Sequence, residues 1–309
     1  MKYWPIILFS IAVNAPQAHA DVYAQAWEDL TYLSAPERDG REPNSQGSID
    51  AQQRIVARFK QAQLQALNGG DNFYHPFTLK SGLNNFSGTN VLAVTHGQDS
   101  GLIVLTAHYD HLGRIQGRVH PGADDNASGV AVMLALAHLS QTKAWQHGLL
   151  FAATDAEEKG LIGSKAMLQQ EEFPLAHIVA NLNLDMLGQF GRPPRLYLTG
   201  TQSHPAFNAL VEDINATVLL DSQVRLIKDH RQARSRRSIN TEINFKRASD
   251  HAVFADAGIP YLFLGVGEHP WYHTAQDSAD RIDPANLALA IDVAWALLNN
   301  VDKRLAKEN

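Results

Sequence analysis

The chain has 309 residues, 45% of them hydrophobic and 19% charged, and this composition is that of a globular protein with a large core rather than a disordered chain. Its formal net charge of −6 at pH 7 argues against nucleic acid as a partner, because phosphate binding needs excess positive charge. The absence of cysteine excludes disulfides and thiolate ligands, which leaves His, Asp and Glu as donors for any metal site.

The first 20 residues have the pattern of an export signal. Lys2 supplies one positive charge, residues 4–13 are apolar, and Ala18-His19-Ala20 is a small-x-small cleavage motif. We expect removal of residues 1–20, a single mature domain over residues 21–309, and a periplasmic or secreted location. A retained anchor is the alternative, but the apolar run is about half of the ~20 residues that a spanning helix needs. We therefore expect no stable membrane insertion after the signal is removed.

Downstream of this segment, helical periodicity and short apolar runs alternate. Residues 22–67 have helical patterning with a polar interruption at 35–47, and Asn68-Gly69-Gly70 marks a change to strands. In chain order, the expected strands are 72–79, 89–95, 102–107, 149–153, 178–184, 196–199 and 261–264. The expected helices are 127–139, 161–169, 204–216 and 284–301. This alternation predicts an α/β fold whose mixed, largely parallel central sheet is sandwiched by helices.

Polar clusters follow the apolar runs, where the ends of parallel strands collect functional groups. The first, AHYDHLG at 107–113, contains His108, a candidate metal ligand, and Asp110, a candidate acceptor for the other ring N–H of His108. The second, PGADDNASG at 121–129, places Asp124 and Asp125 before a helix. One of these carboxylates or Asn126 could cap that helix. Two adjacent carboxylates repel each other unless a cation lies beside them, which favours a metal site.

The remaining clusters supply further candidate donors. TDAEEKGL at 154–161 contains Glu157 and Glu158. These two side chains could simply be solvated charges. Alternatively, one carboxylate binds a metal and its neighbour takes a proton from activated water. Asp185 follows the strand 178–184, and His273 lies after the last strand. A turn cap and a surface histidine are the ordinary explanations for these two. The occurrence of five compatible donors at separate strand ends favours a metal centre.

The ordered motifs resemble those of the M28 family of zinc aminopeptidases. The resemblance covers about residues 88–283, and it rests on AHYDH, GADDNASG, DAEEKGLxGS, NLDM and YHTxxD in this order, with GTNV, SDH and GIP as further matches. It implies a zinc-exopeptidase fold with two zinc ions per chain. Asp125 would bridge the ions, and each ion would take two further donors. The implied pairs are His108 with Asp185, and Glu158 with His273.

The same resemblance implies that Glu157 is the general base, that Asp110 supports His108, and that Tyr272 binds substrate. The implied activity is hydrolysis of the first peptide bond of peptides with a free N-terminus, through a metal-activated water.

Several alternatives stay open at this point. A carboxypeptidase of the same family and a noncatalytic peptide-binding module on the same fold would share these motifs. Glutaminyl cyclases share the fold with a single zinc, whereas the donors for a second metal, His108 and Asp185, are both present here. M20-type amidohydrolases use similar donors but insert about a hundred residues between the last two, whereas Asp185 and His273 are 88 positions apart. The basic segment 228–237 is either a solvated loop or a rim that attracts acidic side chains or a peptide carboxylate.

Overall fold

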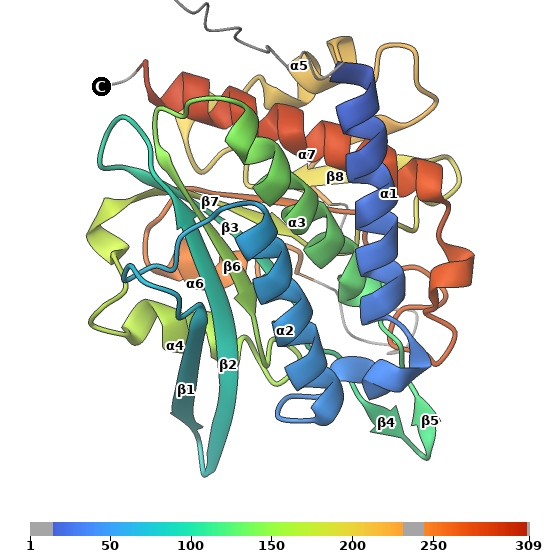
Figure 1. Ribbon diagram of the computed structural model, residues 1–309. Helices are drawn as coiled ribbons and strands as arrows, with labels where there is room; N and C mark the ends of the chain where they lie inside the picture. The colour runs from blue at the N-terminus through green and yellow to red at the C-terminus, as the bar shows by residue number, and fades with distance from the viewer. Residues whose placement is uncertain (1–14, 231–243, 308–309) are drawn as a thin grey trace, which may run out of the picture.

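The computed structural model describes residues 15–230 and 244–307 (Figure 1). Most of the predicted signal and residues 231–237 of the basic segment lie outside the described residues, so both interpretations stay predictions. Helix α1 (Ala15–Leu33) continues through the predicted cleavage position at Ala20. Within the described ranges, no helix is long and apolar enough to cross a membrane.

An eight-stranded sheet forms the centre of the molecule, in the order β1-β2-β6-β3-β7-β10-β8-β9 (Figure 1). The strands are β1 Tyr74–Ser81, β2 Asn84–Thr95, β3 Leu102–His108, β6 Gly148–Thr154, β7 Ile178–Leu184, β8 Arg195–Thr199, β9 Arg225–Lys228 and β10 Tyr261–Gly265. The four central strands β6, β3, β7 and β10 run parallel, whereas β1, β2 and β8 pair antiparallel with their inner neighbours. The predicted mixed, largely parallel sheet is confirmed.

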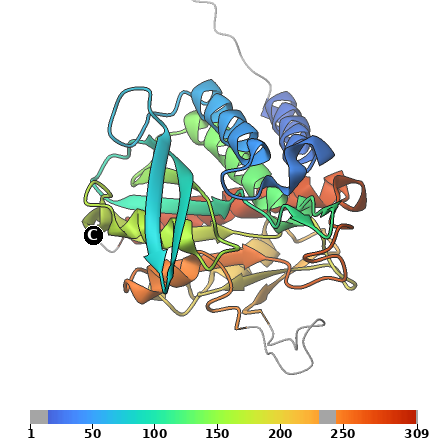
Figure 2. The same cartoon turned by 90° about the horizontal axis from the view of Figure 1, so that it is seen from below.

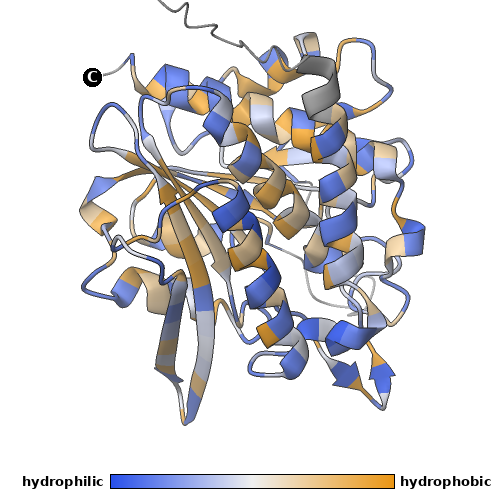
Figure 3. Ribbon diagram, in the orientation of Figure 1, coloured by the Kyte–Doolittle hydropathy of each residue, from blue (hydrophilic) through white to orange (hydrophobic). Residues whose placement is uncertain are grey.

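Helices cover both faces of this sheet (Figure 2). One layer contains α1, α2 (Gln46–Gln61), α3 (Gly129–Leu139) and α7 (Pro284–Leu305), which contact one another. The other contains α4 (Ile162–Gln169) and α6 (His251–Asp256), and α5 (Leu210–Ala216) packs against β9 and α7. Almost every residue of α3 is buried, because the sheet lies on one side of it and α1, α2 and α7 on the other. Figure 3 shows the contrast with α1 and α2, which carry hydrophilic residues outward.

Some elements differ from the sequence prediction. The helix expected over 204–216 is split into a short 3-10 turn, Pro205–Phe207, and α5. Strand β9, helix α6 and the two-stranded hairpin β4–β5 (Arg114–Ile115 and Arg118–Val119) were not predicted. Strand β9 is an edge strand with exposed polar residues, so it lacks an apolar run, and α6 is too short to show helical periodicity.

Arg41 connects the N-terminal helices to the loops at the edge of the sheet through hydrogen bonds. Its side chain is fully buried and donates hydrogen bonds to four backbone carbonyls, those of Leu33 (2.6 Å), Tyr109 (2.7 Å), Pro121 (2.7 Å) and Gly122 (2.9 Å). Burial lowers the pKa of Arg41 to about 10, so the guanidinium stays charged at neutral pH. A single side chain therefore holds the loop after β3 and the segment before α3 together.

We predict that Arg41→Met lowers the free energy of unfolding by about 3–5 kcal/mol, because four buried carbonyls lose their donor. Denaturant unfolding at pH 7 measures this loss. Arg114→Met is the control: its side chain is 54% exposed and pairs with Asp39, so we expect a change below about 1 kcal/mol. Equal losses in the two variants would contradict the anchoring role of Arg41.

Two histidines are buried among aromatic rings near β8 and β10. The His230 ring stacks on Phe245 and Phe263, with centroids 4.4 and 4.7 Å away, and His251 stacks on Phe263 at 4.5 Å. Burial lowers the pKa of His230 to about 3 and that of His251 to about 4. Both side chains are therefore neutral in the folded protein at neutral pH.

These lowered pKa values predict acid sensitivity. A histidine with a pKa of about 6.5 in the unfolded chain gains a proton more readily there, so stability is complete above pH 6.5 and falls as pH drops towards 3. Each group accounts for about 2 kcal/mol lost between pH 7 and pH 5. We expect His230→Phe to lose less stability over this interval than the unmodified protein, as measured by urea unfolding at both pH values. The exposed His138 is the control, and His138→Phe should keep the full loss.

Candidate metal centre

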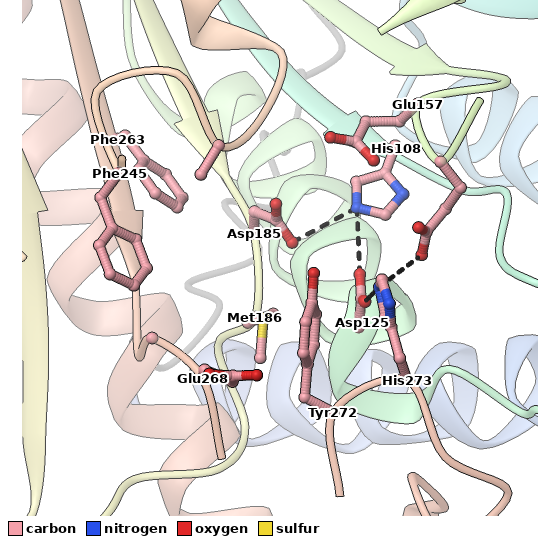
Figure 4. Close-up of a pocket in the computed structure, with 13 residues that line it drawn as sticks. His108, Asp125, Glu157, Asp185, Met186, Phe245, Phe263, Glu268, Tyr272 and His273 are labelled. Atoms are coloured by element: carbon pink, nitrogen blue, oxygen red, sulfur yellow. Dashed lines mark ion pairs between the residues drawn. The ribbon is translucent and has the colours of Figure 1, made fainter. Parts of the chain in front are cut away.

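The predicted donors meet at one edge of the sheet, beyond the carboxyl ends of the parallel strands (Figure 4). Each comes from a different segment: the end of β3, the segment before α3, and the loops after β6, β7 and β10. In that order they are His108, Asp125, Glu158, Asp185 and His273. Parallel strands end at the same edge, which brings donors that are up to 165 positions apart, His108 to His273, into one cluster.

Asp125 lies at the centre of the cluster. Its Oδ1 atom is 3.3 Å from His108 Nε2, which is also 3.4 Å from Asp185 Oδ1. Its Oδ2 atom is 3.0 Å from His273 Nε2, which is also 3.2 Å from Glu158 Oε1. The two oxygens of one carboxylate therefore face two separate groups of donors.

The local structure before α3 shows which residue caps that helix. Asn126 Oδ1 accepts a hydrogen bond at 2.9 Å from the N–H of Gly129, the first residue of α3, so Asn126 supplies the side-chain acceptor there. Asp124 accepts from Gly188 N, and its other oxygen is 3.1 Å from His269 Nε2. Asp125 is thereby left to face the cluster.

The Asp110 carboxylate lies beside His108, as expected, and has further partners. It accepts hydrogen bonds from the backbone N–H groups of Glu157 (3.0 Å) and Glu158 (3.3 Å). The carboxylate is 3.7 Å from His108 Nδ1, whereas the backbone oxygen of Asp110 is 3.1 Å from that atom. The carbonyl and the carboxylate of Asp110 therefore both face His108 Nδ1, and the carboxylate also holds the backbone of the two glutamates.

Glu157 lines the cavity and is partly exposed to it. Burial raises the pKa of Glu157 well above its usual range, against the opposing effect of His108, and the nearby carboxylates of Glu158 and Asp250 raise it further. In Asp125, burial is outweighed by His108 and His273, which hold its pKa well below the usual range. Cations bound in this cluster would lower the pKa of Glu157 again, since positive charge favours the ionised form.

The buried atoms without partners indicate what the cluster binds. Among the described residues, buried polar atoms that lack a hydrogen bond include Asp125 Oδ2, Glu158 Oε1, Asp185 Oδ1 and both ring nitrogens of His111. Buried polar atoms are normally paired, so this concentration is unusual. The donors form two groups with mutual separations within 4.8 Å, His108–Asp125–Asp185 and His111–Asp125–Glu158. Imidazole and carboxylate donors without sulfur fit zinc, so the residues suit two divalent cations.

A cavity of about 50 Å³ opens beside these donors. Its apolar lining includes Met186, Phe245 and Phe263, and Glu268 lies at its edge (Figure 4). Tyr272, predicted to bind substrate, lines the same cavity. Its ring stacks on His273 with centroids 3.8 Å apart, and its hydroxyl points towards the donors.

Several residues at the site had no predicted role. His111 belongs to the AHYDH motif, so the motif itself contained the signal. Asp277 belongs to YHTxxD and accepts hydrogen bonds from the backbone N–H groups of Asp124 and Asp125 at 3.0 and 3.1 Å. Arg41 and His269 lie outside every motif, and no sequence pattern pointed to them.

Comparison with known proteins places the chain among peptidases. The model of peptidase family M28 matches residues 90–298. Aminopeptidase YwaD of Bacillus subtilis is 29% identical over 221 residues, which cover 67% of this chain and 42% of that protein. A probable leucine aminopeptidase of Arthroderma otae is 27% identical over 210 residues, covering 64% of this chain and 53% of that protein. The chain thus spans about half the length of these curated relatives.

Solved structures share the fold at low sequence identity. BSAP, a zinc aminopeptidase from Bacillus subtilis, has a TM-score of 0.68 and 17% identity, with 90% of this chain and 95% of that chain covered. Glutaminyl cyclase from Porphyromonas gingivalis has a TM-score of 0.68 and 18% identity, with 93% and 98% covered. These likenesses agree with the sheet order and helical layers described above. Since the family match extends over more than half of the sequence, the chain belongs to peptidase family M28.

Proposed function

We propose that this chain is an exported zinc aminopeptidase that uses two zinc ions to hydrolyse the N-terminal peptide bond of peptides. The observation that carries the proposal is the convergence of two donor groups on the two oxygens of Asp125, with Glu157 beside them and a cavity in front. Family membership and the aminopeptidase names of the relatives support the activity. The signal-like residues 1–20 support export.

The donors have distinct proposed roles. Asp125 would bridge the ions, His108 and Asp185 would hold one, and Glu158 and His273 the other. When bound, the zinc ions would supply Lewis acidity, which makes a water more acidic and polarises the scissile carbonyl.

Glu157 is the proposed general base. Its carboxylate would accept the proton of the attacking water and deliver it to the nitrogen of the departing amine. Its backbone N–H is fixed by Asp110, so the side chain starts from a defined position at the cavity. Tyr272 would bind substrate through its hydroxyl; burial raises the pKa of this group, which keeps it a hydrogen-bond donor at neutral pH.

The lining of the cavity favours an aminopeptidase over a carboxypeptidase. A carboxypeptidase needs a cationic side chain to bind the terminal carboxylate, and none of the described residues that line the cavity is Lys or Arg. Carboxylates around the cavity instead suit a protonated α-amine. The apolar wall formed by Met186, Phe245 and Phe263 would receive the side chain of the N-terminal residue.

A noncatalytic peptide-binding module needs neither the paired donor groups nor a base. This chain retains all five predicted donors and Glu157 in one cluster, which favours the enzyme.

We predict that Glu157→Gln lowers kcat for an aminoacyl-p-nitroanilide by about 10²–10⁴-fold, because the amide cannot accept the proton. Metal analysis should still find about two zinc ions per chain in this variant, as in the unmodified protein. The exposed Glu171 provides the control, and Glu171→Gln should keep the full rate. A Glu157→Gln variant with unchanged kcat would exclude the proposed base.

We also predict that a chelator abolishes hydrolysis, that added zinc restores it, and that only substrates with a free amino terminus are cleaved. A panel of aminoacyl, N-acetylated and C-amidated peptides tests the requirement for a free amino terminus. Cleavage of C-amidated peptides should persist, whereas N-acetylated peptides should resist. The reverse pattern would indicate a carboxypeptidase, and activity that survives chelation would rule out the metal mechanism.

A further inference from the structure

A second imidazole faces the same oxygens as His273. His111, fully buried in the loop after β3, places Nδ1 2.9 Å from Glu158 Oε1 and 3.8 Å from Asp125 Oδ2. His273 Nε2 lies 3.2 and 3.0 Å from the same two atoms. The two rings meet edge to face, with centroids 5.7 Å apart. Two histidines from different loops thus converge on one pair of carboxylate oxygens.

This close approach is not a hydrogen bond. Neither ring nitrogen of His111 has a hydrogen-bond partner among the described residues, and neither Glu158 Oε1 nor Asp125 Oδ2 has one. At 2.9 Å the distance would allow a hydrogen bond, so the direction of the N–H must be unsuitable. Donors that share a cation lie close together without hydrogen bonds between them, because each lone pair points at the ion rather than at the neighbouring donor.

The separations between the imidazoles and the carboxylate oxygens also fit a shared ion. Zinc bonds to nitrogen and oxygen are about 2.0–2.1 Å long, which places tetrahedral donors about 3.3 Å apart. The four separations between the two imidazoles and the two oxygens are 2.9, 3.0, 3.2 and 3.8 Å. They lie around that value.

The position of the His111 ring is set by its surroundings. A Cβ atom added at Gly122 would lie 2.5 Å from the ring, so only glycine leaves room for it. The backbone N–H of His111 donates to the carbonyl of Arg41 at 3.4 Å. The loop is therefore attached to the same residue that holds the segment before α3.

We infer that His111 Nδ1 is a further zinc donor and joins Asp125, Glu158 and His273 at one ion. The inference rests on the proposed function, since it presumes that zinc binds. That ion then has four protein donors, whereas the group of His108, Asp125 and Asp185 has three. Three-donor sites keep a position for water or substrate, and Glu157 lies beside His108 (Figure 4).

The competing explanation is that His111 only positions Glu158 by donating an N–H. Two variants separate the roles. His111→Ala removes both functions, whereas His111→Asn keeps an N–H donor near the position of Nδ1 but lacks the imidazole. His120→Ala is the matched control, because His120 is also buried and lies in the same connection between β3 and α3, with Nδ1 near the backbone oxygen of Arg118.

Zinc affinity is measured by competition with a chromophoric chelator, independently of activity. We expect two tightly held ions in the unmodified protein and in His120→Ala. In both His111 variants we expect one ion to be held at least about 100-fold more weakly. Wild-type affinity in His111→Ala, or its recovery in His111→Asn, would overturn the inference.

A second measurement does not depend on the variants folding. In protein labelled with ¹⁵N-histidine and loaded with ¹¹³Cd, scalar coupling identifies each ring nitrogen bound to metal. We expect coupling to Nδ1 of His111 and to Nε2 of His108 and His273. Coupling to the two Nε2 atoms alone would overturn the inference while leaving the proposed function intact. Failure of the unmodified protein to bind two metal ions would instead count against the proposed function.

Discussion

The structure is organised around four carboxylates that are buried together in one small volume. Asp110, Asp125, Glu158 and Asp185 are removed from most of their water, and buried charges are costly unless they are paired. Different groups in the fold compensate these negative charges. Backbone N–H groups bind the Asp110 carboxylate, imidazoles face Asp125, and the oxygens still unpaired suit divalent cations.

Arg41 supplies positive charge from behind this cluster. It interacts electrostatically with Asp277, Asp110 and Asp125, although its hydrogen bonds all go to backbone carbonyls. The guanidinium therefore offsets negative charge without occupying the carboxylate oxygens that would bind metal. Arg41 thus contributes both to the stability of the N-terminal helices and to the electrostatics of the site.

The sequence predicted what depends on local pattern. Apolar runs located the central strands, and polar residues at their ends located His108, Glu158 and Asp185, because parallel strands end at a common edge. Contacts between distant segments could not be predicted in this way. Arg41 bonds to Tyr109, 68 positions away, and His269 pairs with Asp124 through a loop that has no periodicity. For Asp110 the sequence indicated the neighbouring His108, but only the folded loop shows that its carboxylate also accepts hydrogen bonds from two backbone amides.

The Asp277 carboxylate also affects how the site moves. It spans the amides of Asp124 and Asp125, and His269 from the same loop reaches Asp124. The loop after β10 and the turn before α3 are consequently clamped into one rigid body, although they are about 150 positions apart in the chain. If this loop moves, Asp125 and His273 would move with it. The distance between these two donors would then stay the same even when the cavity opens or narrows.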